Sequence, residues 1–101
     1  MSAMQTGSVN FHSQGSSVTN ENDTSSFTDV TFPTPFPEGS NVIVIPMVQT
    51  FNGADTPGLR MTDVSITGFK IRMNELVGKH QCLSDGNHST ETIGWVAFSV
   101  C

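Results

Sequence analysis

The chain has 101 residues and a formal net charge of −5, with 36% hydrophobic and 13% charged residues. A chain of this length is expected to form one domain, residues 1–101, and its acidic balance argues against nucleic acid or an anionic membrane as a partner. No apolar run approaches the roughly 18 residues that cross a bilayer, so no membrane insertion is expected. No signal pattern follows Met1, which leaves localisation unknown, with cytoplasmic synthesis and a surface role both compatible.

The composition is typical of a β-rich protein, with nine glycines, five prolines and many Ser and Thr residues. Short alternating apolar segments are separated by polar stretches, and no segment requires a helix. We expect six strands, at residues 4–11, 27–32, 41–51, 59–66, 69–73 and 90–100.

The run of β-branched residues at 41–45 predicts a strand that is buried on both faces. Pro46 interrupts this strand, and a proline there requires an edge position or a bulge. The strands at 59–66 and 69–73 predict a hairpin with its turn at residues 67–68. In the second strand we expect Phe69, Ile71 and Met73 to point inward and Lys70 and Arg72 to point outward.

The last strand is apolar on both faces. Ile93, Trp95 and Ala97 fall on one side of an extended chain, and Val96 and Phe98 fall on the other. Such a strand needs cover on both sides. Another sheet or a neighbouring subunit would supply it, and the shortness of the chain favours the subunit.

Two long polar segments connect the strands. Residues 12–26 read either as a linker or as a binding loop that carries Glu21 and Asp23. Residues 74–89 form the second segment. The two cysteines, Cys82 and Cys101, do not have the spacing of a metal or redox pair, and the sequence leaves their disulfide state open.

Several of these segments, taken together in their order along the chain, form a more specific pattern than any one of them alone. They are Gln5-Thr-Gly7, Val30-Thr-Phe32 before a proline-rich turn, Val42–Ile45 before Pro46, Arg60 seven residues before Thr67-Gly-Phe-Lys70, and Ile93-Gly-Trp95. With this order the chain resembles the H-type lectin domain of snail agglutinins and discoidins. The resemblance implies an all-β, six-stranded antiparallel β-sandwich that assembles as a homotrimer, with pairing into hexamers left open.

The function implied by the resemblance is multivalent adhesion or agglutination. Terminal N-acetylgalactosamine or galactose would bind in clefts between subunits, without a metal or other cofactor. Arg60 occupies the position of the family's sugar-binding arginine, and a guanidinium offers five donors in a fixed fork. Without the resemblance, a structural ion pair of Arg60 with Asp63 or Glu91 is the preferred interpretation.

The resemblance implies two further walls of the site. The family's aspartate comes from the loop before the second strand, where Asp23 and Glu21 are both candidates. The family also places an aromatic residue and a histidine after the Gly-Phe-Lys strand, but this chain has Leu and Val there and no Tyr. His80 and His88 are the candidates for the missing ring.

Other functions find less support in the sequence. The ligand types at His80, Cys82, Asp85 and His88 match no standard zinc spacing, so we expect no metal site. No nucleophile elbow or paired-carboxylate signature is present, so we do not expect an enzyme. The alternative is a trimeric attachment or structural module, such as a fibre tip, whose sugar site is degenerate.

Overall fold

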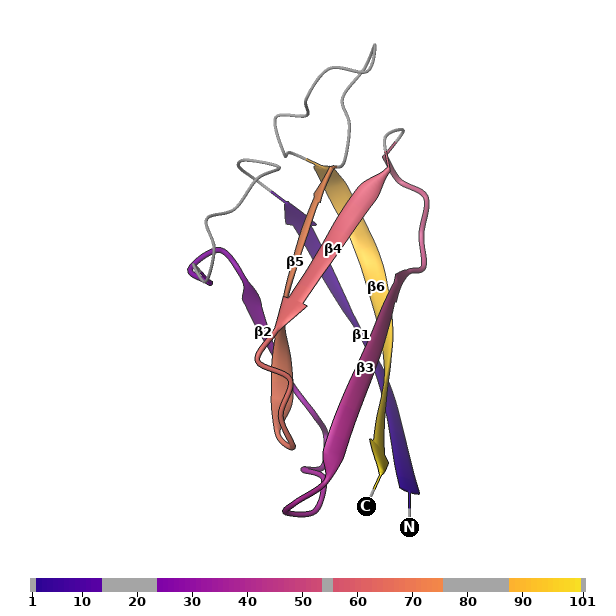
Figure 1. The fold of residues 1–101 in the computed structure, drawn as a ribbon. Coiled ribbons are helices and arrows are strands. Elements are labelled where there is room, and N and C mark those ends of the chain that lie inside the picture. The colour runs from indigo at the N-terminus through magenta and orange to yellow at the C-terminus, as the bar shows by residue number, and fades with distance from the viewer. Residues whose placement is uncertain (1, 14–23, 54–55, 76–87, 101) are drawn as a thin grey trace.

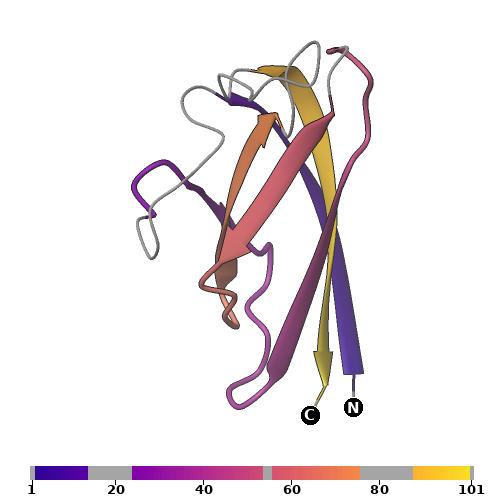
Figure 2. The same ribbon diagram turned by 45° about the horizontal axis from the view of Figure 1, so that its top comes forward.

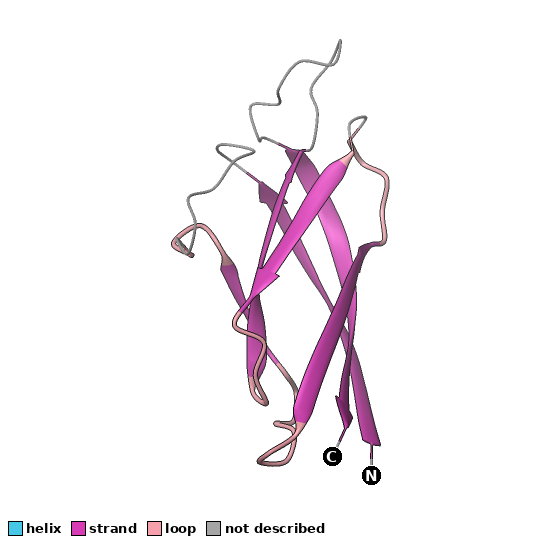
Figure 3. Cartoon of the chain, in the orientation of Figure 1, coloured by secondary structure: helices cyan, strands magenta, loops and turns pink. Residues whose placement is uncertain are grey.

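The computed structural model describes residues 2–13, 24–53, 56–75 and 88–100, with the backbone alone at residues 2, 11–13, 75 and 88. All secondary structure in these ranges is strand (Figure 3). The described residues therefore contain no helix that could span a membrane. The six strands are β1 (Ser2–Ser13), β2 (Thr28–Thr31), β3 (Asn41–Val48), β4 (Pro57–Thr62), β5 (Gly68–Glu75) and β6 (His88–Val100).

The strands form two antiparallel three-stranded sheets, which confirms the predicted all-β architecture. Sheet A has the order β1-β6-β3 and sheet B has the order β2-β5-β4. The sheets lie in two layers, and the chain ends lie side by side at one end of sheet A (Figures 1 and 2). This follows from the β1–β6 register, in which Ser2 pairs with Val100.

The core lies between the two sheets. Its members are Phe32, Phe36, Val44, Phe69, Ile71, Met73, Ile93, Trp95 and Ala97. The ring of Phe32 packs against three other rings, with centroid distances of 5.1 Å to Phe36, 5.5 Å to Trp95 and 5.9 Å to Phe69. Aromatic pairs at these distances add stabilisation beyond the area that they bury.

The proline-rich segment after β2 closes one end of the sandwich. The backbone N–H of Phe32 donates to the Thr67 carbonyl at 2.9 Å, and that of Phe36 donates to the Ile66 carbonyl at 2.8 Å. The Gln5 side-chain amide donates to the Thr34 carbonyl at 2.5 Å. These bonds tie the segment to both sheets. The prolines have no backbone N–H and cannot join a ladder, but the bonds of Phe32 and Phe36 keep these two rings in the core.

Strand β6 has the predicted inner face. Ile93, Trp95 and Ala97 are buried, whereas Val96 and Phe98 on the outer face are only half-buried. No second layer of the described chain covers this outer face. Cover by a neighbouring subunit therefore stays a prediction.

The prediction that the strand at 41–45 is buried on both faces is wrong for the single chain. Val44 is buried, but Ile43 and Ile45 are each 52% exposed. The reason is that β3 is an edge strand of a sheet that packs on one side only. Pro46 lies in an edge strand, one of the two positions that it was expected to require, because among the described strands β3 pairs with β6 alone.

The β4–β5 hairpin is confirmed, but β4 is shorter than predicted, and the connection runs over residues 63–67 rather than 67–68 because Gly68 already belongs to β5. Strand β4 ends at Thr62, because Asp63 has a φ of 55° and so leaves the extended conformation. In β5, Phe69, Ile71 and Met73 are buried as predicted.

Candidate functional site

The outer face of sheet B carries the polar side chains that the fold brings together. In the register, Arg60 of β4 lies opposite Arg72 of β5. In the next row of the same face, Lys70 lies between Thr62 of β4 and Asp29 of β2. Residues that pair directly share one face of a sheet, so these side chains all belong to the outer face of sheet B.

Arg60 is the sequence-predicted site residue that the structure describes in full. It lies on edge strand β4 and its side chain is exposed. Within the described residues, its guanidinium makes neither a hydrogen bond nor an ion pair. The alternative pairing of Arg60 with Asp63 or Glu91 is therefore wrong, since Glu91 faces the interior from sheet A. The Arg60 donors remain available to a ligand.

Arg72 differs from the prediction that it projects into solvent. It lies on the outer face as expected, but it is only 6% exposed, like its neighbour Asn74. Arg72 therefore adds positive charge beside Arg60 while offering little surface of its own. The exposed Arg60 is therefore the member of this cross-strand pair that a ligand can reach.

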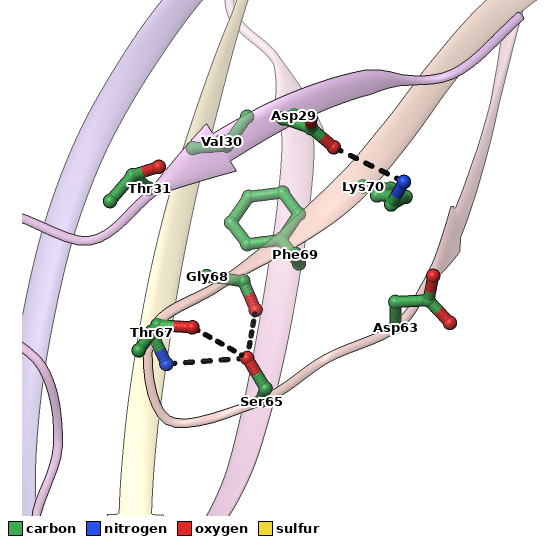
Figure 4. A pocket seen from close by; sticks show the side chains of 9 residues that line it. All are labelled: Asp29, Val30, Thr31, Asp63, Ser65, Thr67, Gly68, Phe69 and Lys70. Carbon is green, nitrogen blue, oxygen red and sulfur yellow. Dashed lines mark hydrogen bonds and ion pairs between the residues drawn. The ribbon is translucent and has the colours of Figure 1, made fainter. Parts of the chain in front are cut away.

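A shallow, open hollow of about 240 Å³ lies next to this surface, between β2, β5 and the β4–β5 turn (Figure 4). Its lining residues are Asp29, Val30, Thr31, Asp63, Ser65, Thr67, Gly68, Phe69 and Lys70. The Lys70 ammonium lies 3.5 Å from an Asp29 carboxylate oxygen, and both side chains are substantially exposed. The hollow thus combines carboxylates, hydroxyls and one ammonium with apolar atoms.

The β4–β5 turn holds the hydroxyl side of the hollow in place. The Ser65 hydroxyl accepts from the Thr67 backbone N–H at 3.2 Å and donates to the Gly68 carbonyl at 3.3 Å (Figure 4). Gly68 is required, because a Cβ there would overlap the Val30 carbonyl oxygen. The turn is therefore held by its own hydrogen bonds.

Arg60 lies just outside the hollow, one row along the same face. Alternate residues of a strand are about 7 Å apart, so Arg60 is about that distance along β4 from Thr62, which neighbours Lys70. A flexible guanidinium can cover such a distance. A polyhydroxylated ligand in the hollow would meet carboxylate acceptors and, at one side, the Arg60 donors.

The other predicted site residues are not placed by the structure. Glu21, Asp23 and His80 lie outside the described residues, and His88 begins β6 with only its backbone described. Cys82, Asp85 and Cys101 also lie outside them. Within the described part, no three His, Cys, Asp or Glu side chains lie close enough to hold a metal ion.

Sequence reasoning missed Asp29, Asp63 and Lys70 as members of one hollow. Each stands alone in the sequence, and only the pairing of β2 with β5 and the turn at Asp63 bring them together. Comparisons of the chain with family models, with curated proteins and with solved structures found no match.

Proposed function

We propose that the protein is a metal-independent lectin that binds terminal N-acetylgalactosamine or galactose and acts as a trimer in adhesion or agglutination. The observation that carries this proposal is the exposed, uncommitted Arg60 guanidinium beside a polar hollow on the outer face of sheet B. Its donors have a fixed geometry, which suits the ring and hydroxyl oxygens of a sugar.

The carboxylates of the hollow would complete recognition. A carboxylate accepts hydrogen bonds from two neighbouring hydroxyls, so Asp29 and Asp63 can distinguish sugars by the orientation of their hydroxyl groups. Lys70 would donate to a third oxygen. Glu21 or Asp23 and His80 or His88 remain proposed contributors, as the resemblance to H-type lectins implies.

The outer face of sheet A supports the trimer. Met4, Ile43, Ile45, Met47 and Val100 are all exposed there, each by more than half of its surface. Contiguous apolar surface of this kind is uncommon on monomers and marks interaction sites. A trimer would present several weak sites together, which can raise effective affinity by roughly 10² to 10⁴.

The test is a glycan array with the wild type, Arg60→Ala and Arg60→Lys, with and without a chelator. The wild type should bind terminal galactose or N-acetylgalactosamine regardless of the chelator. Arg60→Ala should lose at least about tenfold in affinity, the equivalent of one good hydrogen-bonding contact. Arg60→Lys keeps the charge and loses the fork, so it should bind weakly as well. Retained binding by Arg60→Ala would refute the site.

The second candidate is a trimeric attachment or structural module. The apolar outer face of sheet A favours this module as much as the lectin, because assembly through that face needs no sugar. A folded wild-type trimer that binds no sugar on the array would select this candidate.

A further inference from the structure

Asn52 is the one asparagine of the chain that is followed by a glycine. In such a pair the backbone nitrogen of the glycine can attack the side-chain amide, because no Cβ hinders its approach. Asparagine is accordingly one of the thermolabile residues of proteins. The pair lies in the connection from β3 to β4, and Asn52 is exposed there (Figure 1). Water therefore reaches the groups that would react.

The reaction, deamidation, consumes two hydrogen-bond donors. The Gly53 nitrogen loses its proton and forms a bond to Cγ of Asn52, the bond from Cγ to Nδ2 breaks, and Nδ2 leaves with that proton as ammonia. Water then opens the cyclic imide to aspartate or isoaspartate. The Gly53 N–H is lost while the ring forms, and the Asn52 side-chain N–H groups are lost for good.

In the folded chain both of these donors are bound to β6. The Gly53 N–H donates to a carboxylate oxygen of Glu91 at 3.1 Å, and the Asn52 side-chain amide donates to the Thr90 carbonyl at 2.9 Å. Neither bond can persist while the ring forms and ammonia leaves. A hydrogen bond to a charged group is worth more than one between neutral groups, so Glu91 imposes the stronger of the two restraints.

The Glu91 carboxylate is itself fixed. Its side chain is only 1% exposed. It also accepts the Thr50 hydroxyl at 2.7 Å and the Asn52 backbone N–H at 3.0 Å. The Thr50 hydroxyl in turn accepts the Thr92 N–H at 2.9 Å. The acceptor of the Gly53 N–H is thus held by the loop and by β6 together.

The negative charge of Glu91 opposes the reaction as well. The attacking nitrogen becomes negative when its proton leaves, and a carboxylate at hydrogen-bonding distance disfavours a second negative charge. A carboxylate is also too weak a base to remove an amide proton. Glu91 therefore protects the pair and does not activate it.

Reaction at Asn52 would prevent the loop from closing again as before. The product carries a carboxylate close to that of Glu91, which repels it, and the Thr90 carbonyl loses its donor. Isoaspartate also lengthens the main chain just before the Gly53 N–H. A loop that has opened and reacted therefore cannot restore its original hydrogen bonds.

We propose that Asn52-Gly53 is a deamidation site that the Glu91 carboxylate keeps unreactive in the folded protein. The pair then reacts only when residues 50–53 open locally, and the product is a permanent record of that opening. The inference depends neither on a sugar ligand nor on the trimer.

The test is the rate of deamidation at residue 52 at mildly alkaline pH, measured by mass spectrometry of proteolytic peptides. The wild type should react at least about tenfold faster in urea than when folded, because neither hydrogen bond then opposes the reaction. Glu91→Gln keeps an acceptor and loses the charge, so its rate when folded should lie between these two. Asn10 and Asn41, each followed by a bulky residue, are the internal controls.

Gly7→Ala is the matched control for stability, because a Cβ at Gly7 would strain the core against the Trp95 indole and not the loop. It should react at the wild-type rate while it stays folded. Equal acceleration in Gly7→Ala and Glu91→Gln would mean that the overall stability of the fold protects the pair, and the inference would be wrong. A Glu91→Gln rate equal to that of the wild type would overturn it as well, as would a folded wild type that reacts as fast as the protein in urea.

A second measurement tests the effect of the product on the loop. Asn52→Asp carries the charge of one product, and Asn52→Ala loses the same amide without adding charge. The urea midpoint of Asn52→Asp should therefore be the lower of the two. Equal midpoints would refute the repulsion by Glu91.

Discussion

Gly7 lies opposite Trp95 in the β1–β6 ladder, and the space above it is filled. A Cβ at Gly7 would overlap Cζ2 of the indole and lie 2.7 Å from Cε2. The indole cannot retreat, because its centroid is 5.5 Å from that of Phe32 and 5.7 Å from that of Phe69. Gly7→Ala should therefore disrupt the aromatic cluster at the centre of the core.

The magnitude follows from two opposing terms. Overpacking a filled core costs about 1–3 kcal/mol, and Ala in a strand recovers about 0.5–1 kcal/mol relative to Gly. We expect the free energy of unfolding to fall by about 1–2 kcal/mol. With a urea dependence of about 1–2 kcal/mol per molar, the unfolding midpoint should fall by roughly 1 M.

Gly94→Ala is the matched control, because it makes the same change on the other face of the same sheet. A Cβ there would lie 2.9 Å from the Gln49 side-chain nitrogen, which is the end of a flexible side chain and can move. We expect a change within about 0.5 kcal/mol.

Urea unfolding at one protomer concentration is the assay, because oligomers link stability to concentration. Trp95 is the single tryptophan, so its fluorescence reports directly on the cluster. Equal midpoints for the wild type, Gly7→Ala and Gly94→Ala would refute the packing argument.

Three further variants test the turn, the hollow and the loop. Asp63→Val should lower the free energy of unfolding by about 1–2 kcal/mol, because Asp63 has a positive φ, and Asp63→Asn should not; the same urea titration checks both. Lys70→Met should change it by less than about 1 kcal/mol, since the ion pair with Asp29 is exposed; a larger loss in thermal unfolding would contradict this. Glu91→Ala should cost about 2–4 kcal/mol, because buried donors lose their acceptor, and amide exchange at residues 52–53 should rise with it.

Alternation in the sequence was sufficient to predict which residues of the central strands enter the core. Ile93 and Trp95 in β6, and Ile71 and Met73 in β5, are buried as predicted. The period of two is a local property of an extended chain, so it can be read without knowledge of the pairing.

Alternation did not show whether a second face is covered. Ile43 and Ile45 belong to a run that is also typical of a strand buried on both sides, yet both are exposed in the single chain. The edge position of β3 depends on its pairing with β6, about half the chain away in sequence. The pattern records which residues are apolar, but the partner of each strand depends on the whole topology.

The candidate site was predictable only in part for the same reason. Arg60 was proposed from the resemblance to H-type lectins, which spans most of the chain. Asp29 and Lys70 meet through the β2–β5 register, which no local motif marks. Asp63 was assigned to a continuing strand, because the apolar alternation persists through Val64 and Ile66 although the backbone turns at Asp63.

The two outer faces of the sandwich have opposite chemistry, and this bears on how a sugar would be held. The Lys and Arg side chains of the described residues all lie on the outer face of sheet B, whereas the described side chains on that of sheet A are uncharged. Assembly through sheet A would leave the polar faces free for multivalent binding. Arg60, Asp29 and Asp63 belong to one chain, so subunits dissociated by dilution should keep the single-site affinity and lose only the avidity. If single-site affinity were also lost, the neighbouring subunit would have to supply part of each site, as the resemblance to H-type lectins implies.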